Sequence, residues 1–321
     1  MKSNLIREIS LPAVAPIYRS VQNDTFLIFA EMKLYSINTG FFKLDGGAMF
    51  GVVPKSMWNK TNPADVNNMI SLAMRALLIE DGNKLILIDN GMGTKQESKF
   101  LSYYFLHGED TLEKSLAKHG FSPDDITDTF LSHLHFDHCG GSVKWNSDRT
   151  KFELTFKNAT YWSNEQHWAW ATKPNKREMA SFLKENIIPI EESGHLKFLE
   201  GARDTGQMTG EYLSTKELGD NISIMLSSGH TDAMMHPHIK YKGKTIVYMA
   251  DLLPTVGHIP LPYVMGYDTR PLITLEEKEK FINKAAEEEY ILFLEHDPMN
   301  ECCTLQKTEK GVRLKEVFPL P

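Results

Sequence analysis

The chain has few cysteines and no long apolar segment. Its 321 residues include only Cys139, Cys302 and Cys303, two of which are adjacent. Adjacent cysteines rarely bridge each other, so we expect no disulfide framework and favour a reducing compartment. No uncharged apolar run reaches the ~18 residues of a membrane span, and residues 1–18 lack the unbroken apolar stretch of a secretory signal. We therefore expect a cytoplasmic protein that has no membrane partner.

Excess positive charge is also absent. The chain has 35 Lys and Arg against 42 Asp and Glu, which gives a net charge of −7. Without a basic surface or a basic run, nucleic acid is not an expected partner. The sequence also lacks repeats, low-complexity tracts and a Pro/Gly/Ser linker, and it carries no Gly-x-Ser-x-Gly or Walker motif. We expect a single α/β domain over residues 1–321, without a serine nucleophile.

Short β-like runs recur, and several of them end at His or Asp. Residues 71–80 and 84–88 form a predicted hairpin around Asp81-Gly82-Asn83, and helices are expected at 111–119 and from a capping box at Thr274 to about residue 289. Further runs at 84–88, 126–132, 222–226, 245–250 and 290–294 lead to Asp89, His133, His230, Asp251 and His296. Residues at strand ends converge at one edge of a layered sheet, so we predict a polar centre there.

The densest polar cluster follows the run that ends at Ser132. It contains His133, His135, Asp137 and His138 within six residues. At the end of a strand, His133 and His135 face one way, while Asp137 and His138 turn back toward a second position. Imidazole and carboxylate ligands suit Zn²⁺ and tolerate Mn²⁺, Fe²⁺ or Co²⁺. The spacing therefore predicts a metal centre, with Gly140-Gly141 packed tightly behind it.

The motif His133-x-His135-x-Asp137-His138 resembles the signature of the metallo-β-lactamase superfamily. Four other segments of this chain also resemble segments of the family and occur in the same order: residues 87–91, 228–231, 250–251 and 295–297. The resemblance implies a four-layer αββα sandwich with two Zn²⁺ per chain. It assigns the first ion to His133, His135 and His230, the second to Asp137, His138 and His296, and a bridging role to Asp251. Asp89 would support these ligands.

Two such cations share a hydroxide that is nucleophilic at neutral pH, which predicts hydrolysis of an ester, lactone, amide, thioester or phosphoester. Asp137 belongs to the predicted catalytic set. The loop at residues 44–55 resembles that of N-acyl-homoserine lactone lactonases, which would place Met49 and Phe50 at the substrate, although both could simply join the core. Trp162 and Trp168, in a helical insertion at about 160–190, could line the substrate site or attach the insertion to the body.

One position departs from the lactonase pattern. Those enzymes carry a tyrosine three positions after the bridging aspartate, where this chain has Pro254. Its role is absent or falls to another residue: His258 is the candidate general acid, and Tyr263 and Tyr267 lie nearby.

The resemblance favours an enzyme that opens N-acyl-homoserine lactones and so quenches quorum sensing, with an organophosphate triester or aryl ester hydrolase as the alternative. A nucleic-acid-processing enzyme, a β-lactamase and a non-catalytic metal protein are disfavoured by the charge, by the absence of an export signal and by the complete ligand set. The resemblance further suggests a homodimer, and residues 1–30 would form an N-terminal extension.

Overall fold

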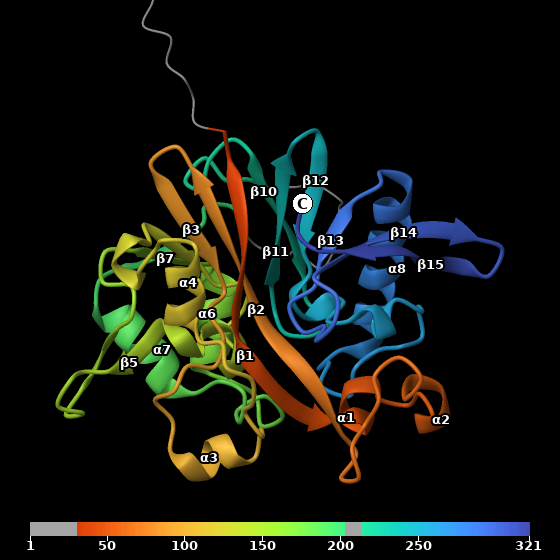
Figure 1. The fold of residues 1–321 in the computed structure, drawn as a ribbon, viewed down its shortest axis with the longest axis horizontal. Helices are drawn as coiled ribbons and strands as arrows, with labels where there is room; N and C mark the ends of the chain where they lie inside the picture. Colours follow the sequence, from red (N-terminus) through yellow and green to blue (C-terminus); the bar gives the residue numbers. More distant parts are fainter. Residues whose placement is uncertain (1–30, 203–212) are drawn as a thin grey trace, which may run out of the picture. The chain divides into compact units, whose positions relative to one another are not determined.

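Two β-sheets form the centre of the fold in this computed structural model, which describes residues 31–202 and 213–321. The first sheet has the strand order β1-β2-β3-β4-β7-β8 and the second the order β15-β14-β13-β12-β11-β10-β9 (Figure 1). The strands of the first are β1 (Lys33–Asp45), β2 (Met69–Asp81), β3 (Lys84–Ile88), β4 (Asp128–Phe130), β7 (Thr160–Ser163) and β8 (Leu196–Phe198). Those of the second are β9 (Leu213–Ser214), β10 (Ile222–Ser227), β11 (Met234–Tyr241), β12 (Lys244–Tyr248), β13 (Ile291–Phe293), β14 (Cys302–Thr308) and β15 (Gly311–Phe318).

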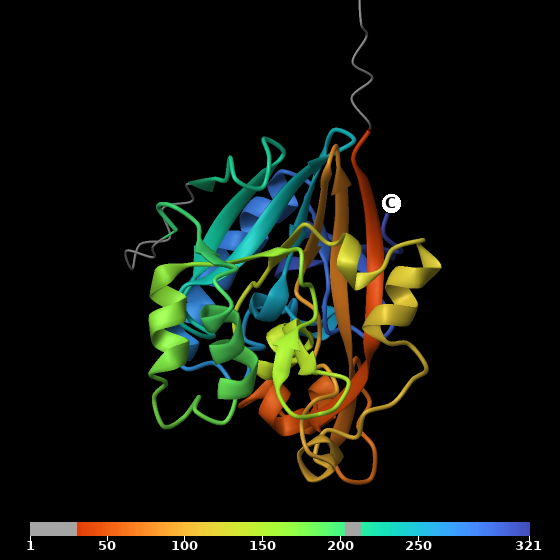
Figure 2. The ribbon, with the colours of Figure 1, turned by 90° about the vertical axis from the view of Figure 1, so that its left-hand side faces the viewer.

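The two sheets pack face to face, and helices cover their outer faces (Figures 1 and 2). The helices are α1 (Gly46–Phe50), α2 (Lys55–Trp58), α3 (Ser98–Ser102), α4 (Leu112–Lys118), α5 (Phe136–Cys139), α6 (Glu165–Thr172), α7 (Lys184–Glu192) and α8 (Pro271–Glu287). A small hairpin of β5 (Val143–Trp145) and β6 (Phe152–Leu154) stands apart from both sheets. The αββα sandwich implied by the resemblance is confirmed. The proposed extension at residues 1–30 lies outside the described residues.

Alternation along the strands explains the layering. In β2 and β3, Ile79 and Ile86 contribute to a core shared with the second sheet, whereas Leu78 and Leu87 contribute to a core shared with the helices. Successive side chains of a strand point to opposite faces, so these apolar runs bury both faces of the first sheet. The expected hairpin is confirmed, since β2 and β3 pair antiparallel around Gly82.

Two predicted element boundaries differ from the structure. The last long helix begins at Pro271, not at a Thr274 cap, because proline at the first helical position already has the required φ. Thr274 is buried in that helix. Residues 160–163, expected to start a helical insertion, instead form strand β7, which pairs in parallel with β4. Consequently, Trp162 belongs to the sheet.

Candidate metal centre

The predicted ligand residues follow four strands that end at the same edge of the two sheets. His133 and His135 lie between β4 and α5, and Asp137 and His138 lie on α5 itself. The turn after β10 supplies His230, a short 3₁₀ turn after β12 supplies Asp251, and the segment after β13 supplies His296. All seven residues are at most 8% exposed. The sequence prediction that strand ends gather these residues is confirmed.

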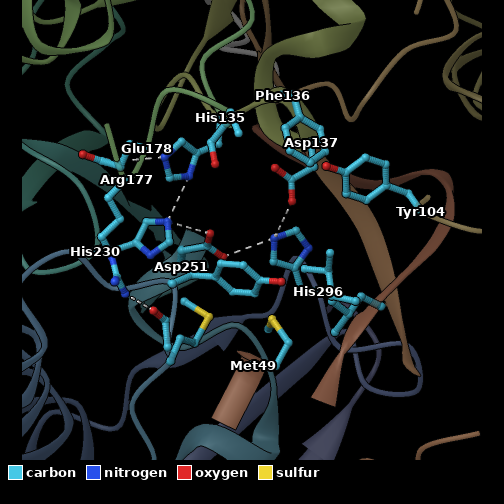
Figure 3. A pocket seen from close by; sticks show the side chains of 17 residues that line it. Met49, Tyr104, His135, Phe136, Asp137, Arg177, Glu178, His230, Asp251 and His296 are labelled. Atoms are coloured by element: carbon cyan, nitrogen blue, oxygen red, sulfur yellow. Dashed lines mark hydrogen bonds and ion pairs between the residues drawn. The ribbon is translucent and has the colours of Figure 1, made fainter. Parts of the chain in front are cut away.

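The first group consists of His133, His135, His230 and Asp251. Nδ1 of His135 lies 3.1 Å from Nε2 of His133 and 3.1 Å from Nε2 of His230. The Oδ2 atom of Asp251 lies 3.0 Å from Nε2 of His230 (Figure 3). Four donor atoms within 4.8 Å of one another could hold one metal ion. The set of three imidazoles and a carboxylate suits Zn²⁺.

The second group consists of Asp137, His138 and His296, with Asp251 beside it. Nε2 of His138 lies 3.1 Å from Nε2 of His296, and Oδ2 of Asp137 lies 3.8 Å from the latter atom. The Oδ1 atom of Asp251 lies 3.2 Å from Nε2 of His296, whereas its Oδ2 atom faces His230. Oδ2 also lies 3.4 Å from Nε2 of His138, so the Asp251 carboxylate stands between the two groups, where a bridging ligand would lie.

Electrostatics at Asp251 fit a cationic site. Burial alone would raise the pKa of this carboxyl, but His230, His138 and His296 hold it well below its usual range. Its Oδ1 atom is buried without a hydrogen-bond donor among the described residues. An ionised, buried carboxylate with one oxygen left without a hydrogen bond is costly unless cations balance its charge. The residues present therefore fit a pair of divalent ions.

In three of the five histidines, the second ring nitrogen is held from outside the centre. Nδ1 of His230 contacts the buried Asp268 at 2.8 Å, and Nδ1 of His296 contacts the Ala73 carbonyl at 2.8 Å. For His138, Nδ1 lies 3.1 Å from Asp89 and 3.0 Å from Glu295. Such outer partners fix the ring orientation and the tautomer of metal-binding histidines. Asp89 thus stands where the sequence predicted, as a support and outside both groups.

Close backbone packing keeps the histidine segment in place. An added Cβ at Gly141 would lie 2.2 Å from the Asn90 carbonyl oxygen, and one at Gly140 would lie 2.2 Å from that of Met92. Only glycine permits this approach. The ring of His167 accepts a hydrogen bond from the Leu134 amide at 2.9 Å, so this buried histidine shapes the segment between His133 and His135. The predicted tight packing behind the cluster is confirmed.

A cavity of about 340 Å³ opens above the centre. Its walls include residues of both groups, apolar and aromatic residues, and a few further polar ones. They are Leu44, Met49, Leu72, Tyr104, His135, Phe136, Asp137, Arg177, Glu178, Ala180, Ser181, His230, Asp251, Met265, Gly266, Tyr267 and His296. Figure 3 shows Tyr104 directing its hydroxyl toward Asp137. The cavity could accommodate a small organic molecule with its polar end at the centre and an apolar part against Met49, Leu72 and Met265.

The predicted substrate residues divide between cavity and core. Met49 and Asp137 line the cavity, as expected. Phe50 does not: it is fully buried and stacks between Trp58 at 5.3 Å and His258 at 4.3 Å. It therefore belongs to the core.

Both tryptophans are likewise absent from the cavity walls. Trp162 is 7% exposed, and its indole N–H donates to Asp128 at 2.8 Å from within the sheet. Trp168 is 4% exposed and packs in the core between α6 and the first sheet. The prediction that they bind substrate is corrected: strand β7 and helix α6 direct both rings inward, so they attach this region to the body.

The prediction for His258 is also corrected. Its Nε2 lies 2.9 Å from the Met49 carbonyl, which can only accept, so Nε2 carries the hydrogen. Its Nδ1 faces the Thr255 hydroxyl at 2.9 Å. Burial lowers the pKa of His258 to about 3, which keeps the ring neutral. With both nitrogens occupied and the ring buried, His258 holds helix α1 in place and is not available as a general acid.

Sequence reasoning missed two polar cavity residues, Arg177 and Glu178, which lie between α6 and α7. Arg177 donates to the carbonyl oxygens of Gly266 and Asp268 and so connects this segment to the opposite wall. Burial alone would raise the pKa of Glu178, but His135 and Thr231 beside it lower that pKa to about 2. No motif surrounds these residues, and only the folded chain shows their position.

Two tyrosines of the cavity wall, Tyr104 and Tyr267, keep their protons over a wide pH range. Burial and the charge of Asp137 raise the pKa of Tyr104 to about 12. Tyr267 is 40% exposed, and its partial desolvation, together with Tyr104, Asp45 and Asp137 nearby, raises its pKa to about 12. From the sequence, Tyr267 was considered only because it lies near Pro254 in the chain. Tyr104, which lies far from the ligand motifs in sequence, was missed.

Comparison with known proteins agrees with this geometry. The sequence profile of the Metallo-beta-lactamase superfamily matches residues 75–296. The N-acyl homoserine lactonase AiiB of Agrobacterium fabrum is 30% identical over 117 residues, which cover 34% of this chain and 42% of that protein. AiiA of Bacillus thuringiensis subsp. kurstaki is 29% identical over 110 residues, which cover 29% of this chain and 43% of that protein. The matched part thus spans about two fifths of these curated relatives.

Solved structures match over a larger share of the chain. A probable metal-dependent hydrolase from Staphylococcus aureus superposes with a TM-score of 0.76 at 26% identity, over 91% of this chain and 99% of that one. The dizinc quorum-quenching lactonase AidC, solved with a product, gives a TM-score of 0.69 at 24% identity, over 91% and 97% of the two chains. The latter likeness establishes the fold alone.

Proposed function

Because the chain belongs to the metallo-beta-lactamase superfamily, we propose that it is a dinuclear metal-dependent hydrolase that opens the lactone ring of N-acyl-homoserine lactones. One observation carries the proposal: the Asp251 carboxylate lies between two buried ligand groups, 3.0 Å from His230 of one and 3.2 Å from His296 of the other, at the floor of a largely apolar cavity. The partial likeness to N-acyl homoserine lactonases supports the choice of substrate.

The proposed ligands are His133, His135 and His230 for one ion and Asp137, His138 and His296 for the other, with Asp251 between them. Two Zn²⁺ ions bound there would supply a hydroxide nucleophile near neutral pH and a Lewis acid for the scissile carbonyl. Mn²⁺, Fe²⁺ or Co²⁺ would fit the same donor atoms.

The chain's own residues would bind and orient the substrate. Met49, Leu72 and Met265 would contact the acyl chain, since these apolar side chains line one part of the cavity. Tyr104 and Tyr267 would donate hydrogen bonds to substrate oxygens, because both hydroxyls stay protonated at neutral pH. Phe136 and Leu44 would exclude water from the rest of the wall.

A substrate panel tests this function. Purified protein loaded with Zn²⁺ should open N-hexanoyl-homoserine lactone, measured as proton release, and chelation should abolish the activity. A panel that adds an aryl ester and an organophosphate triester separates the alternative by the ratio of kcat/KM values. Faster turnover of the triester than of every lactone would replace the proposed substrate, and no turnover of any lactone by the loaded protein would refute it.

A further inference from the structure

Glu178 both faces a histidine of the centre from outside and lines the cavity. Among the described residues that contact a second ring nitrogen of the five histidines, Glu178 alone also lines the cavity. Its side chain is 3% exposed, and its Oε1 atom lies 3.6 Å from Nε2 of His135 (Figure 3). His135 presents its opposite nitrogen, Nδ1, to His133 and His230.

The other carboxylate oxygen of Glu178 is fixed. Oε2 accepts a hydrogen bond from the indole N–H of Trp170 at 2.8 Å and one from the Asn175 amide at 2.6 Å. With Oε2 held by two donors, Oε1 is directed at His135 and has no hydrogen-bond donor at normal distance among the described residues. A carboxylate aimed at an imidazole favours the tautomer whose near nitrogen carries the hydrogen, which leaves the far nitrogen free to bind a metal.

We propose that Glu178 is a positioning residue that keeps the hydrogen of His135 on Nε2 and so makes Nδ1 a ligand of the ion held by His133, His135 and His230. The inference rests on the proposed dinuclear centre. The proposal gives Trp170 and Asn175 a role in the site, because their hydrogen bonds hold the carboxylate that orients His135. Because Glu178 lines the cavity, its contact with His135 lies within the proposed substrate site.

Glutamine has nearly the same shape as glutamate, but at position 178 it would face His135 with a hydrogen-bond donor in place of an acceptor. The amide oxygen of Glu178→Gln must face the two donors from Trp170 and Asn175, so its NH₂ group faces His135. A donor there favours the tautomer with the hydrogen on Nδ1, which cannot bind a cation. The matched control is Glu192→Gln at the end of α7, which makes the same charge change at an exposed residue.

Stepwise metal titration tests the proposal. Zn²⁺ is titrated into the chelator-treated protein against a chromophoric competitor, and Co²⁺ absorption reports each coordination sphere. We expect Glu178→Gln to weaken one binding step by about 10- to 100-fold and to change the Co²⁺ spectrum of that step, as outer-partner substitutions do. The other step should stay unchanged, and Glu192→Gln should change neither step.

The outcomes separate this proposal from the proposed function. Fewer than two ions bound to the unmodified protein would refute the dinuclear centre itself. Two ions, with both steps unaffected by Glu178→Gln or both weakened equally, would refute the role of Glu178 alone. Should Glu178→Gln fail to fold, Glu178→Asp, which draws the carboxylate back by one methylene, is titrated instead, and the same loss in one step is expected.

Discussion

The histidines of this centre have different pKa values because different charged groups surround them. All five histidines are buried, yet the pKa of His230 is raised to about 10, since Asp251 and Asp268 outweigh the effect of burial. The pKa of His133 lies well below its ordinary value, because burial and the neighbouring His138 and His135 all disfavour its charge. The neighbouring carboxylates therefore determine which histidines favour a positive charge, and Asp251 is the carboxylate that lies between the two groups.

Substitution of Asp251 should affect both ions. In Asp251→Asn, a neutral amide replaces the carboxylate that faces His230 with one oxygen and His296 with the other. We expect the metal content to fall below two ions per chain and kcat/KM for the lactone to fall by more than about 100-fold, beyond the usual cost of an outer-partner change. Elemental analysis and initial rates measure both effects. Asp220→Asn, at an exposed position, is the control, and a fully active Asp251→Asn would contradict the bridging role.

Lys278 provides a prediction for pH. It is 1% exposed, donates to the carbonyls of Pro260 and Tyr263 near the cavity wall, and has a pKa lowered by burial to about 7. The unfolded chain therefore binds more protons at this residue between about pH 7 and pH 10, so its contribution to stability rises with pH across that window.

Urea unfolding at pH 7, 8 and 9 tests this sign. The difference in unfolding free energy between the unmodified protein and Lys278→Met should shift with pH by up to about 1.4 kcal/mol per unit, in favour of the unmodified protein at higher pH. Lys280→Met, which removes a half-exposed lysine of the same helix, is the matched control. A difference that stays constant over these pH values would show that Lys278 does not titrate there.

At the scale of secondary-structure elements, the turns that leave the strands position the ligands, and α8 supports one of them. The backbone amides of Ser228 and Gly229 donate to the carboxylate of Glu277 on α8 at 2.7 and 3.0 Å, and Arg270, just before α8, donates to the Ser228 carbonyl. An added Cβ at Gly229 would lie 2.3 Å from the backbone nitrogen of Thr274. Strand β10 and helix α8 thus hold the His230 turn between them.

Gly229→Ala should disturb this junction. Since the clash is with backbone, the turn or the helix must move, which we expect to cost about 1–3 kcal/mol of unfolding free energy, as overpacking does. The displacement acts on His230, so the affinity for one metal ion should fall while the affinity for the ion near His296 is kept. Chemical denaturation and metal titration measure the two effects. An unchanged denaturation midpoint would mean that the junction is looser than the structure indicates.

Elements with a local signal were predictable from sequence, and those placed by tertiary contacts were not. The hairpin around Gly82 and the group from His133 to His138 are short-range patterns, and both are confirmed. Whether Trp162 faces substrate or core depends on β7 joining the sheet beside β4, which nothing in its own sequence specifies. Glu178 reaches His135 only because the segment between α6 and α7 folds against the cavity, so no local motif could predict this contact.

At the scale of the whole molecule, the described residues form a sandwich whose centre lies where both sheets end. No helix among them is long and apolar enough to cross a membrane. The expected homodimer and cytoplasmic location stay predictions. The site gathers five buried histidines and two buried aspartates from both sheets, so bound ions would connect the two halves of the sandwich and stabilise the folded state as a whole.

Metal removal should therefore lower global stability. Binding restricted to the folded state adds about 2.7 kcal/mol per site when the free ion is at 100 times its dissociation constant. We expect the melting temperature to fall on chelation and to recover when Zn²⁺ is restored, followed by differential scanning calorimetry. Addition of Mg²⁺, which prefers oxygen ligands, should not restore it. Equal melting temperatures with and without Zn²⁺ would count against ions that link the two sheets.

Anomalous diffraction from crystals grown with Zn²⁺, measured on both sides of the zinc absorption edge, would show directly whether the centre holds two ions. We expect two zinc peaks about 3.5–4 Å apart, one beside His133, His135 and His230 and the other beside Asp137, His138 and His296, with Asp251 in contact with both. A single peak, or none, at these side chains in zinc-saturated crystals would contradict it.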